Sequence, residues 1–252
     1  MSCLNGMDWR IGCSGFYYKE WKEIFYTKGL AQKNWFPFYG RHFNTIEINS
    51  TFYRMPTAHA FAKWYVESPP DFLFTIKAPR LITHYKQLND CQSLLNDFYE
   101  AVHQGLKEKL GCVLFQFPPK FDFTEQRLLL LLELLHPAFT NVVEFRHASW
   151  WQATVYEQLA SRSIIFSGQS YPSQLPEELV KNNAILYYRF HGKPILYKST
   201  YPLTAIEKLV EQMPPTTERA FIYFNNTWGN GALTNAKQLQ KLTHSLPTLA
   251  IS

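Results

Sequence analysis

The stretch Asn141-Val-Val-Glu-Phe-Arg-His-Ala-Ser-Trp-Trp151 begins as a predicted strand and ends in charged residues. Val142 and Val143 are β-branched, which favours a strand. Glu144 and Arg146 lie two positions apart, so on a strand both side chains point to the same face. A buried acid and a buried base destabilise a fold unless both are paired. This pattern therefore indicates a functional site rather than simple packing.

Five further apolar runs end in polar residues, and none begins with them. The polar residues at or just beyond these ends are Glu47, Asn49, Lys77, Gln116, Arg189, His191, Asn225 and Asn226. Glu47 and Asn49 share one face of their run, and Arg189 and His191 share one face of theirs. In a barrel the carboxyl ends of all strands converge on one mouth, so these side chains are expected to meet there.

Strands and helices alternate along the whole chain, and we expect eight of each. Strands are predicted at 9–12, 45–48, 72–77, 112–117, the start of 141–151, 163–167, 184–190 and 220–224. Helices are predicted near 30–42, 57–67, 91–110, 124–135, 151–161, 176–181, 204–213 and 231–246.

The length and the alternation together predict the fold class. The chain has 252 residues, and an (α/β)8 barrel typically needs about 250. No Ser/Gly-rich linker marks a second domain, so one domain over residues 1–252 is expected, with the barrel proper at 9–246. The rival layout, an open doubly wound sheet, normally carries a G-x-G-x-x-G turn, which Gly12-Cys-Ser-Gly15 lacks. We therefore predict an α/β fold that forms a single closed (β/α)8 TIM-type barrel.

Composition limits the partners and the compartment. The net charge of +5 permits an anionic partner but does not require nucleic acid. None of the four cysteines forms a C-x-x-C pair, so a zinc ribbon is not expected. The most apolar run, 128–135, contains Glu133 and is too short to cross a bilayer. A cytoplasmic protein without a membrane partner is the expectation.

Several motifs along the chain resemble those of the DUF72 family, also called YecE-like. They are Ile11-Gly-Cys-Ser-Gly15, Glu47-Ile-Asn-Ser-Thr-Phe-Tyr53, Phe74-Thr-Ile-Lys-Ala-Pro79 with Ile82-Thr-His84, Gln116-Phe-Pro-Pro119, Glu144-Phe-Arg-His147 with Ser149-Trp150, Arg189-Phe-His-Gly192, and Tyr223-Phe-Asn-Asn226. The resemblance spans residues 11–246 and implies a TIM-type barrel. It implies little about chemistry, because the family is largely uncharacterised, and its analogy to sugar isomerases concerns the fold alone.

Four of the strand-end residues are candidates for catalysis. Glu47 and Glu144 offer a general acid and a general base, or metal ligands. His191 and Lys77 offer further groups for proton transfer. The alternative is that the two glutamates merely form structural salt bridges with neighbouring cations.

The remaining candidates are expected to bind substrate. Arg146 and Arg189 suit carboxylate or phosphate recognition, unless they only neutralise the glutamates. Side-chain amides orient hydroxyls or carbonyls, and aromatic rings stack on a sugar or base, although core packing is the alternative for the rings. These candidates are Arg146, Arg189, Asn49, Gln116, Asn225, His147, Tyr53 and Trp150.

No cofactor is predicted. Glu47, Glu144 and His191 are residue types that bind a divalent metal, which is the weaker alternative, because nearby Arg and Lys side chains would repel the ion.

The leading hypothesis is an enzyme that acts on a small anionic or polyhydroxylated substrate, bearing a phosphate, sulfate or carboxylate group. A hydrolase, an isomerase and a lyase all fit this pattern, so the reaction stays open. A nucleic-acid-binding or nucleic-acid-processing protein is the first alternative, given the net charge and the loop aromatics. A non-catalytic ligand-binding barrel is the second. The sequence does not indicate an oligomeric state.

Overall fold

The computed structural model describes residues 6–244, and the strands of this part of the chain form two parallel sheets. The strands are β1 (Asp8–Cys13), β2 (Thr45–Ile48), β3 (Leu73–Lys77), β4 (Leu110–Gln116), β5 (Asn141–Glu144), β6 (Ile165–Phe166), β7 (Gly168–Ser170), β8 (Ile185–Phe190) and β9 (Arg219–Phe224). One sheet has four strands in the order β1-β9-β8-β7, and the other has five in the order β2-β3-β4-β5-β6.

The prediction of a closed (β/α)8 barrel is therefore wrong, and so is the TIM-type barrel that the family resemblance implies. The fold is α/β, but its strands pair within two separate sheets. Two junctions between the sheets explain the difference. At one junction β1 lies beside β2, and at the other the chain passes from β6 to β7.

Side chains, rather than a strand ladder, connect β1 to β2. Within residues 6–244, the bridge between Ser14 and Glu47 is the only pairing found there. The Tyr39 hydroxyl accepts from the backbone N–H of Cys13 at 2.7 Å and donates to the Thr45 carbonyl at 3.1 Å. Tyr39 therefore satisfies backbone groups that a direct ladder would otherwise pair.

Asn44 makes a second side-chain connection at the same junction. Its amide oxygen accepts from the Ile11 N–H at 3.1 Å, and its amide nitrogen donates to the Trp9 carbonyl at 2.7 Å. Because an edge strand whose backbone groups are already satisfied has little to gain from pairing, the two sheets stay distinct here.

The second junction lies at Ser167, between β6 and β7. β6 pairs with β5, whereas β7 pairs with β8 in the other sheet. The Ser167 N–H donates to the Val143 carbonyl at 2.8 Å, and its hydroxyl donates to the Gly168 carbonyl at 2.9 Å. The expected single strand at 163–167 is thus replaced by two short strands in different sheets.

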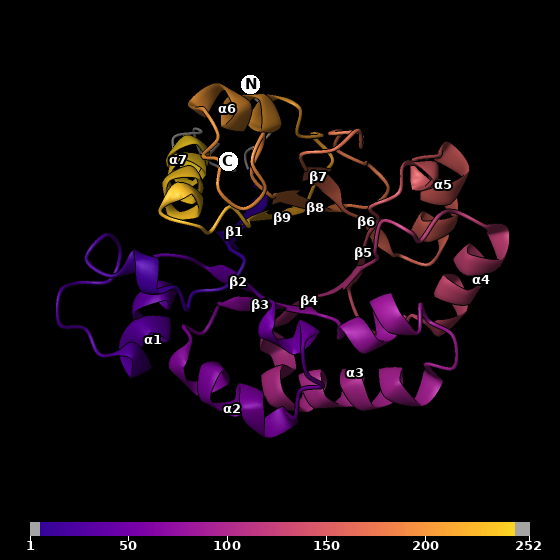
Figure 1. The fold of residues 1–252 in the computed structure, drawn as a ribbon, viewed down its shortest axis with the longest axis horizontal. Coiled ribbons are helices and arrows are strands. Elements are labelled where there is room, and N and C mark those ends of the chain that lie inside the picture. The colour runs from indigo at the N-terminus through magenta and orange to yellow at the C-terminus, as the bar shows by residue number, and fades with distance from the viewer. Residues whose placement is uncertain (1–5, 245–252) are drawn as a thin grey trace, which may run out of the picture.

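Helices cover the outer face of each sheet. They are α1 (Trp35–Gly40), α2 (Ala58–Glu67), α3 (Gln92–Leu106), α4 (Glu125–Leu134), α5 (Ala153–Ser161), α6 (Leu203–Glu211) and α7 (Gly231–His244). In Figure 1, α1 to α5 lie outside the five-stranded sheet, while α6 and α7 lie outside the four-stranded sheet. None of the helices within residues 6–244 combines the length and apolar character that a membrane span requires.

Two predicted helices differ from the structure. The helix expected at 30–42 is reduced to α1, where Pro37 occupies the first turn, a position that needs no backbone N–H. The short helix expected at 176–181 does not form. There the Asn182 side chain donates to the Ile164 carbonyl and accepts from the Phe166 N–H, which holds the connection in an irregular path. The expected end of the last helix, 245–246, lies outside the described residues.

Alternate residues of the strands face two different cores. Between the sheets lies a small cluster made of Cys112, Leu114, Val142, Ile165, Tyr187, Phe221 and Tyr223. Toward the helices lies a larger core that contains Ile46, Ile48, Phe145 and Phe190. The small cluster continues toward the carboxyl ends of the strands with Glu47, Glu144 and Arg189. Their side chains point to the same side of the strands as the cluster, because side chains alternate between the two faces.

Gly12 lets β1 approach β2 closely enough for these side-chain connections. A Cβ at this position would lie 2.2 Å from the Thr45 carbonyl oxygen and 2.9 Å from the Tyr39 hydroxyl. We expect Gly12→Ala to lower the free energy of unfolding by about 3 kcal/mol, because the backbone at the junction must move. Urea denaturation measures this loss. Gly29→Ala is the control: it meets no atom within 4 Å but has a φ of 79°, so it should lose only about 1 kcal/mol. Equal losses would contradict the steric explanation.

Candidate functional site

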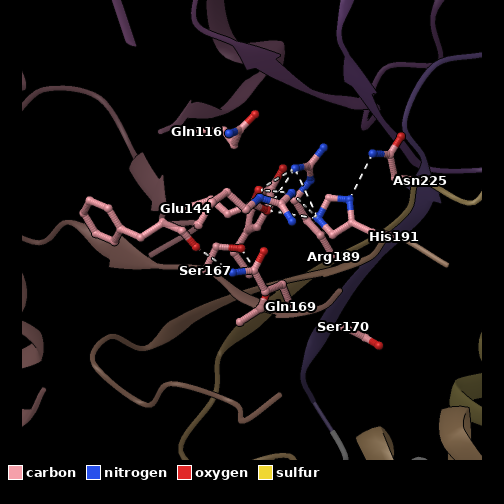
Figure 2. A network of polar contacts seen from close by, with 12 residues as sticks. Gln116, Glu144, Ser167, Gln169, Ser170, Arg189, His191 and Asn225 are labelled. Atoms are coloured by element: carbon pink, nitrogen blue, oxygen red, sulfur yellow. Dashed lines mark hydrogen bonds and ion pairs between the residues drawn. The ribbon is translucent and has the colours of Figure 1, made fainter. Parts of the chain in front are cut away.

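Glu144, the last residue of β5, lies at the centre of a buried ion-pair network. Arg189 of β8 donates from Nη1 to both of its carboxylate oxygens, at 3.0 and 2.9 Å. From Nη2, Arg189 donates to Oε1 of Glu47, in β2, at 2.6 Å. Figure 2 shows Arg189 pointing toward Glu144 from the opposite sheet. Arg189 therefore connects the two sheets through charged hydrogen bonds.

Arg146 and His191 complete the network just beyond the ends of β5 and β8. Nη2 of Arg146 lies 2.5 Å from Oε1 of Glu144 and 2.9 Å from Nε2 of His191. On the other side of the His191 ring, Nδ1 lies 3.1 Å from the side-chain nitrogen of Asn225. Below, "the charged network" denotes Glu47, Glu144, Arg146, Arg189 and His191.

The network is almost completely withdrawn from solvent. The side chains of Glu47 and Glu144 are 0% exposed, that of Arg189 is 1% exposed and that of Arg146 is 6% exposed. Two carboxylates face two guanidinium groups, so the formal charges of these four residues cancel. Such a cluster is stable only while each charge keeps its partner, because an unpaired buried ion is strongly destabilising.

The partners fix the ionisation of the acid and the base at the centre. Burial opposes ionisation of Glu144, but Arg146, Arg189 and His191 outweigh it and hold the pKa of this carboxyl well below its usual range. Burial likewise opposes the charge on Arg189, but Glu144 and Glu47 raise its pKa above the usual value. Both residues are therefore charged at neutral pH.

His191 is neutral in this environment. Burial, followed by the charges of Arg146 and Arg189, holds its pKa well below the usual range, although Glu144 acts in the opposite direction. A neutral imidazole has one donor and one acceptor nitrogen. Asn225 donates from its side-chain nitrogen to Nδ1, whereas Nε2 faces both the Arg146 guanidinium at 2.9 Å and Oε2 of Glu144 at 3.3 Å.

Lys77, the last residue of β3, lies beside the charged network without joining it. Its ammonium nitrogen donates to Oε1 of Gln116, at the end of β4, at 2.9 Å, and lies 4.1 Å from the centre of the Phe52 ring. Burial lowers the pKa of Lys77 to about 7, and Arg189 adds to this effect, whereas Glu144 and Glu47 oppose it. The charge of Lys77 therefore changes near neutral pH.

Two polar candidates lie apart from these contacts. Asn49 is half-buried, and its amide oxygen has no hydrogen-bond partner among residues 6–244. His147 caps the short helix Ala148–Trp150, because its Nδ1 accepts from the Ser149 backbone N–H. Their roles in binding stay predictions.

The two aromatic candidates occupy very different positions. The Trp150 side chain is buried, stacks on Phe145 at 3.9 Å and donates from Nε1 to the Phe121 carbonyl at 2.8 Å. It therefore packs in the core that faces the helices and does not reach the charged network. Tyr53 is 68% exposed, and its ring lies 5.5 Å from the Arg80 guanidinium.

Two residues in contact with the network were not among the candidates. Tyr187 donates from its hydroxyl to Oε2 of Glu47 at 2.7 Å. Its position two residues before Arg189, on the same face of β8, was a signal that could have identified it. The Tyr171 ring lies 3.9 Å from the Arg146 guanidinium, in a cation–π contact. It immediately follows the short strand β7, which the sequence pattern does not separate from β6.

The site holds two glutamates and a histidine, which are possible metal ligands. Within residues 6–244, no group of three or more His, Cys, Asp or Glu side chains is arranged to hold a metal ion. Both network glutamates are instead bound by guanidinium groups. The arrangement can anchor an anion, orient hydroxyl groups through side-chain amides, and exchange a proton at Lys77.

Two proteins of similar sequence match half of the chain or more. The UPF0759 protein YunF of Bacillus subtilis is 27% identical over 267 residues, which cover 92% of this chain and 93% of YunF. The UPF0759 protein YecE of Escherichia coli K12 is 31% identical over 127 residues, which cover 50% of this chain and 46% of YecE.

Solved structures extend the likeness to the fold. A DUF72 family protein from Thermotoga maritima is 26% identical, with a TM-score of 0.85 over 94% of this chain and 100% of that one. A DUF72 family protein from Enterococcus faecalis, 20% identical, gives a TM-score of 0.81 over 94% of this chain and 95% of its own. The family model described as "Protein of unknown function DUF72" matches residues 10–250. Since this match covers nearly the whole chain, the protein belongs to the DUF72 family.

Proposed function

We propose that the charged network and Lys77 form the active site of an enzyme that acts on a small anionic or polyhydroxylated substrate. The observation that carries this proposal is the convergence of two carboxylates, two guanidinium groups, an imidazole and an amine at the carboxyl ends of strands from both sheets. Burying so many ionisable groups opposes folding. Clusters of ionisable groups with displaced pKa values are typical of functional sites.

Arg146 is the proposed anchor for the anionic group of the substrate. Its Nη2 is engaged with Glu144 and His191, but its Nη1 is buried and has no hydrogen-bond partner among the described residues. A buried guanidinium nitrogen without a partner lacks a hydrogen bond that a phosphate or carboxylate oxygen would supply. Glu144 and the Tyr171 ring hold the guanidinium in place for this contact.

Side-chain amides around the network support recognition of hydroxyl groups. The amide oxygen of Asn49 lacks a partner within residues 6–244, and Gln116 and Asn225 contact Lys77 and His191. Amide groups both donate and accept, as hydroxyl groups do. Lys77 is the proposed acid or base, because a group whose pKa lies near neutrality exchanges protons most effectively at that pH.

Inorganic phosphate, titrated by calorimetry at low ionic strength, tests the proposed anchor. We expect Arg146→Met to weaken phosphate binding about tenfold to a hundredfold, because a hydrogen bond to a charged group contributes about 1.5–3 kcal/mol. Arg146→Lys should retain part of the affinity, since it keeps the charge but loses the planar fork.

Arg127→Met, which removes an exposed ion pair with Asp122 on the protein surface, is the matched control and should leave phosphate affinity unchanged. Equal affinity of the wild type and Arg146→Met, with both folded by circular dichroism, would refute the anchor. Wild-type protein that binds phosphate can then be screened for turnover of sugar phosphates and hydroxy acids.

Nucleic-acid binding stays an untested alternative, and salt dependence separates it from the proposal. Binding of a duplex or single strand weakens steeply with salt, because several counterions are released at once. A single buried anchor for one small anion predicts a much shallower dependence. Titrating phosphate and an oligonucleotide at several salt concentrations would therefore distinguish the two functions.

A further inference from the structure

Lys77, which is half-buried, and Lys109, which is buried, place their ammonium groups in very different surroundings. Lys109, just before β4, donates to three oxygen acceptors: the Tyr65 and Ser68 carbonyls, each at 2.9 Å, and the Ser68 hydroxyl at 2.8 Å. Three acceptors engage all three protons of an ammonium group. Burial lowers the pKa of Lys109, but the three acceptors favour its protonated form.

Lys77 has far fewer partners. Its nitrogen donates to one oxygen, that of Gln116 at 2.9 Å, and forms no ion pair with a carboxylate in the part of the chain that the structure describes. The nearby glutamates, Glu47 and Glu144, are already bound by arginine. An amine with one acceptor loses little when it gives up a proton, whereas an ammonium group with three acceptors loses much more.

The surroundings of Lys77 also suit an unprotonated amine. It is half-buried, so a reactant can reach it, and Arg189 and Arg146 both lower its pKa, which burial brings to about 7. The Phe52 ring, 4.1 Å away, favours the cation and partly offsets this effect. A pKa near 7 leaves roughly half of the amine groups unprotonated at neutral pH. Desolvation next to other cations is a known way to make a lysine nucleophilic.

We propose that Lys77 is a nucleophile that forms a Schiff base with a small aldehyde, ketone or 2-oxo acid carrying a phosphate or carboxylate group. This proposal rests on the function proposed above and names its substrate class and its covalent step. The Nζ lone pair attacks the carbonyl carbon, the carbonyl oxygen leaves as water with both amine protons, and a C=N bond replaces C=O. Water reverses the step and releases the product.

The anionic group of the substrate follows from the cations around the amine. Arg146 offers its unpartnered Nη1, and both arginines act electrostatically on Lys77. An anion held there would restore some proton affinity to the amine, which favours the protonated imine over the neutral one. A protonated imine withdraws electrons from the adjacent carbon, so bonds at that carbon are the ones that the site would break or form.

Borohydride trapping tests the covalent step. Wild-type protein is incubated with pyruvate or with dihydroxyacetone phosphate, reduced with sodium borohydride, and analysed by intact mass and peptide mapping. We expect one reduced adduct, located at Lys77, and none at Lys109. Lys77→Arg keeps a cation but cannot form the imine, so it should abolish the adduct. Arg146→Met should lower the yield by weakening the hold on the anion.

Reductive methylation with formaldehyde and cyanoborohydride provides an arm that does not depend on the substrate. Formaldehyde and the amine give an iminium ion and water, and cyanoborohydride supplies the hydride. Lys77 should be labelled at least tenfold faster than Lys109 at neutral pH, with a rate that rises as pH increases through about 7. The same rate in both lysines, or no pH dependence in this range, would overturn the nucleophile.

The two proposals fail in different ways. If phosphate binds through Arg146 but Lys77 is neither trapped by the two carbonyl probes nor labelled faster than Lys109, the Schiff base is refuted and the anion site survives. If phosphate does not bind and Lys77 shows no selective reaction, both proposals are wrong.

Discussion

Arg189→Met is expected to lower the free energy of unfolding by about 3–5 kcal/mol, the range for removing one partner of a buried ion pair. The substitution removes the hydrogen bonds of Arg189 to Glu47 and Glu144 and leaves two carboxylates facing one guanidinium. Glu144 keeps Arg146, and Glu47 keeps the Tyr187 hydroxyl, but Glu47 loses its only ion-pair partner within residues 6–244. Urea denaturation at neutral pH measures the loss.

The loss in free energy of unfolding caused by Arg189→Met should become smaller at low pH. In the wild type the pKa of Glu144 lies well below its usual range. The stability that Glu144 contributes is therefore fully present above its unfolded pKa of about 4.3 and is lost progressively as pH falls from there through the lower folded value. Without Arg189 that folded pKa rises, so the variant has less of this stability to lose. The difference in free energy of unfolding between the variant and the wild type should therefore decrease below about pH 4.

Two companion variants make the test specific. Arg127→Met removes a surface ion pair between α4 and Asp122, which precedes it, and should leave the unfolding midpoint nearly unchanged. Adding Glu47→Gln to Arg189→Met should recover part of the lost stability, because the amide carries no charge. If the urea midpoint of Arg189→Met lies as close to the wild-type midpoint as that of Arg127→Met does, the charged network does not stabilise the fold as described.

Trp150→Ala is expected to lower the free energy of unfolding by about 3–5 kcal/mol, the usual range for removing a large buried aromatic side chain. Trp150 is completely buried, lies parallel to Phe145 at 3.9 Å and hydrogen-bonds to the Phe121 carbonyl. Its removal leaves both a cavity and an unsatisfied carbonyl. This result would assign Trp150 to the core. The sequence had instead predicted that Trp150 binds substrate.

Trp228→Ala is the matched control, because Trp228 is 64% exposed. We expect it to change the denaturation midpoint little. Phosphate affinity, measured where Trp150→Ala is still folded, should equal that of the wild type. A stability loss below about 1 kcal/mol for Trp150→Ala would show that the core relaxes around the missing ring.

Much of the candidate site could be predicted from strand parity. Residues two apart on a strand face the same side, so Glu144 with Arg146, and Arg189 with His191, could be paired without a structure. The family resemblance was likewise visible in short motifs, and the family match confirms it. The same spacing places Tyr187 on the face of Arg189, but it does not show that the Tyr187 hydroxyl contacts Glu47 in the other sheet.

The closure of the sheet could not be predicted in the same way. The alternation of strands and helices is the same for a closed barrel and for two adjoining parallel sheets. What separates them here is a few side chains: Tyr39 and Asn44 between β1 and β2, and Ser167 between β6 and β7. These residues take up backbone hydrogen bonds, which sequence periodicity does not report.

The sequence by itself determined the α/β class, the family and the polar carboxyl ends of the strands, because these depend on local periodicity and on motifs. The tertiary structure alone decided which charges pair, which candidates are buried in the core, and that Lys77 has a single oxygen acceptor while Lys109 has three. The reason is physical: burial and the distance between charges set ionisation and packing, and both depend on residues far apart in the chain.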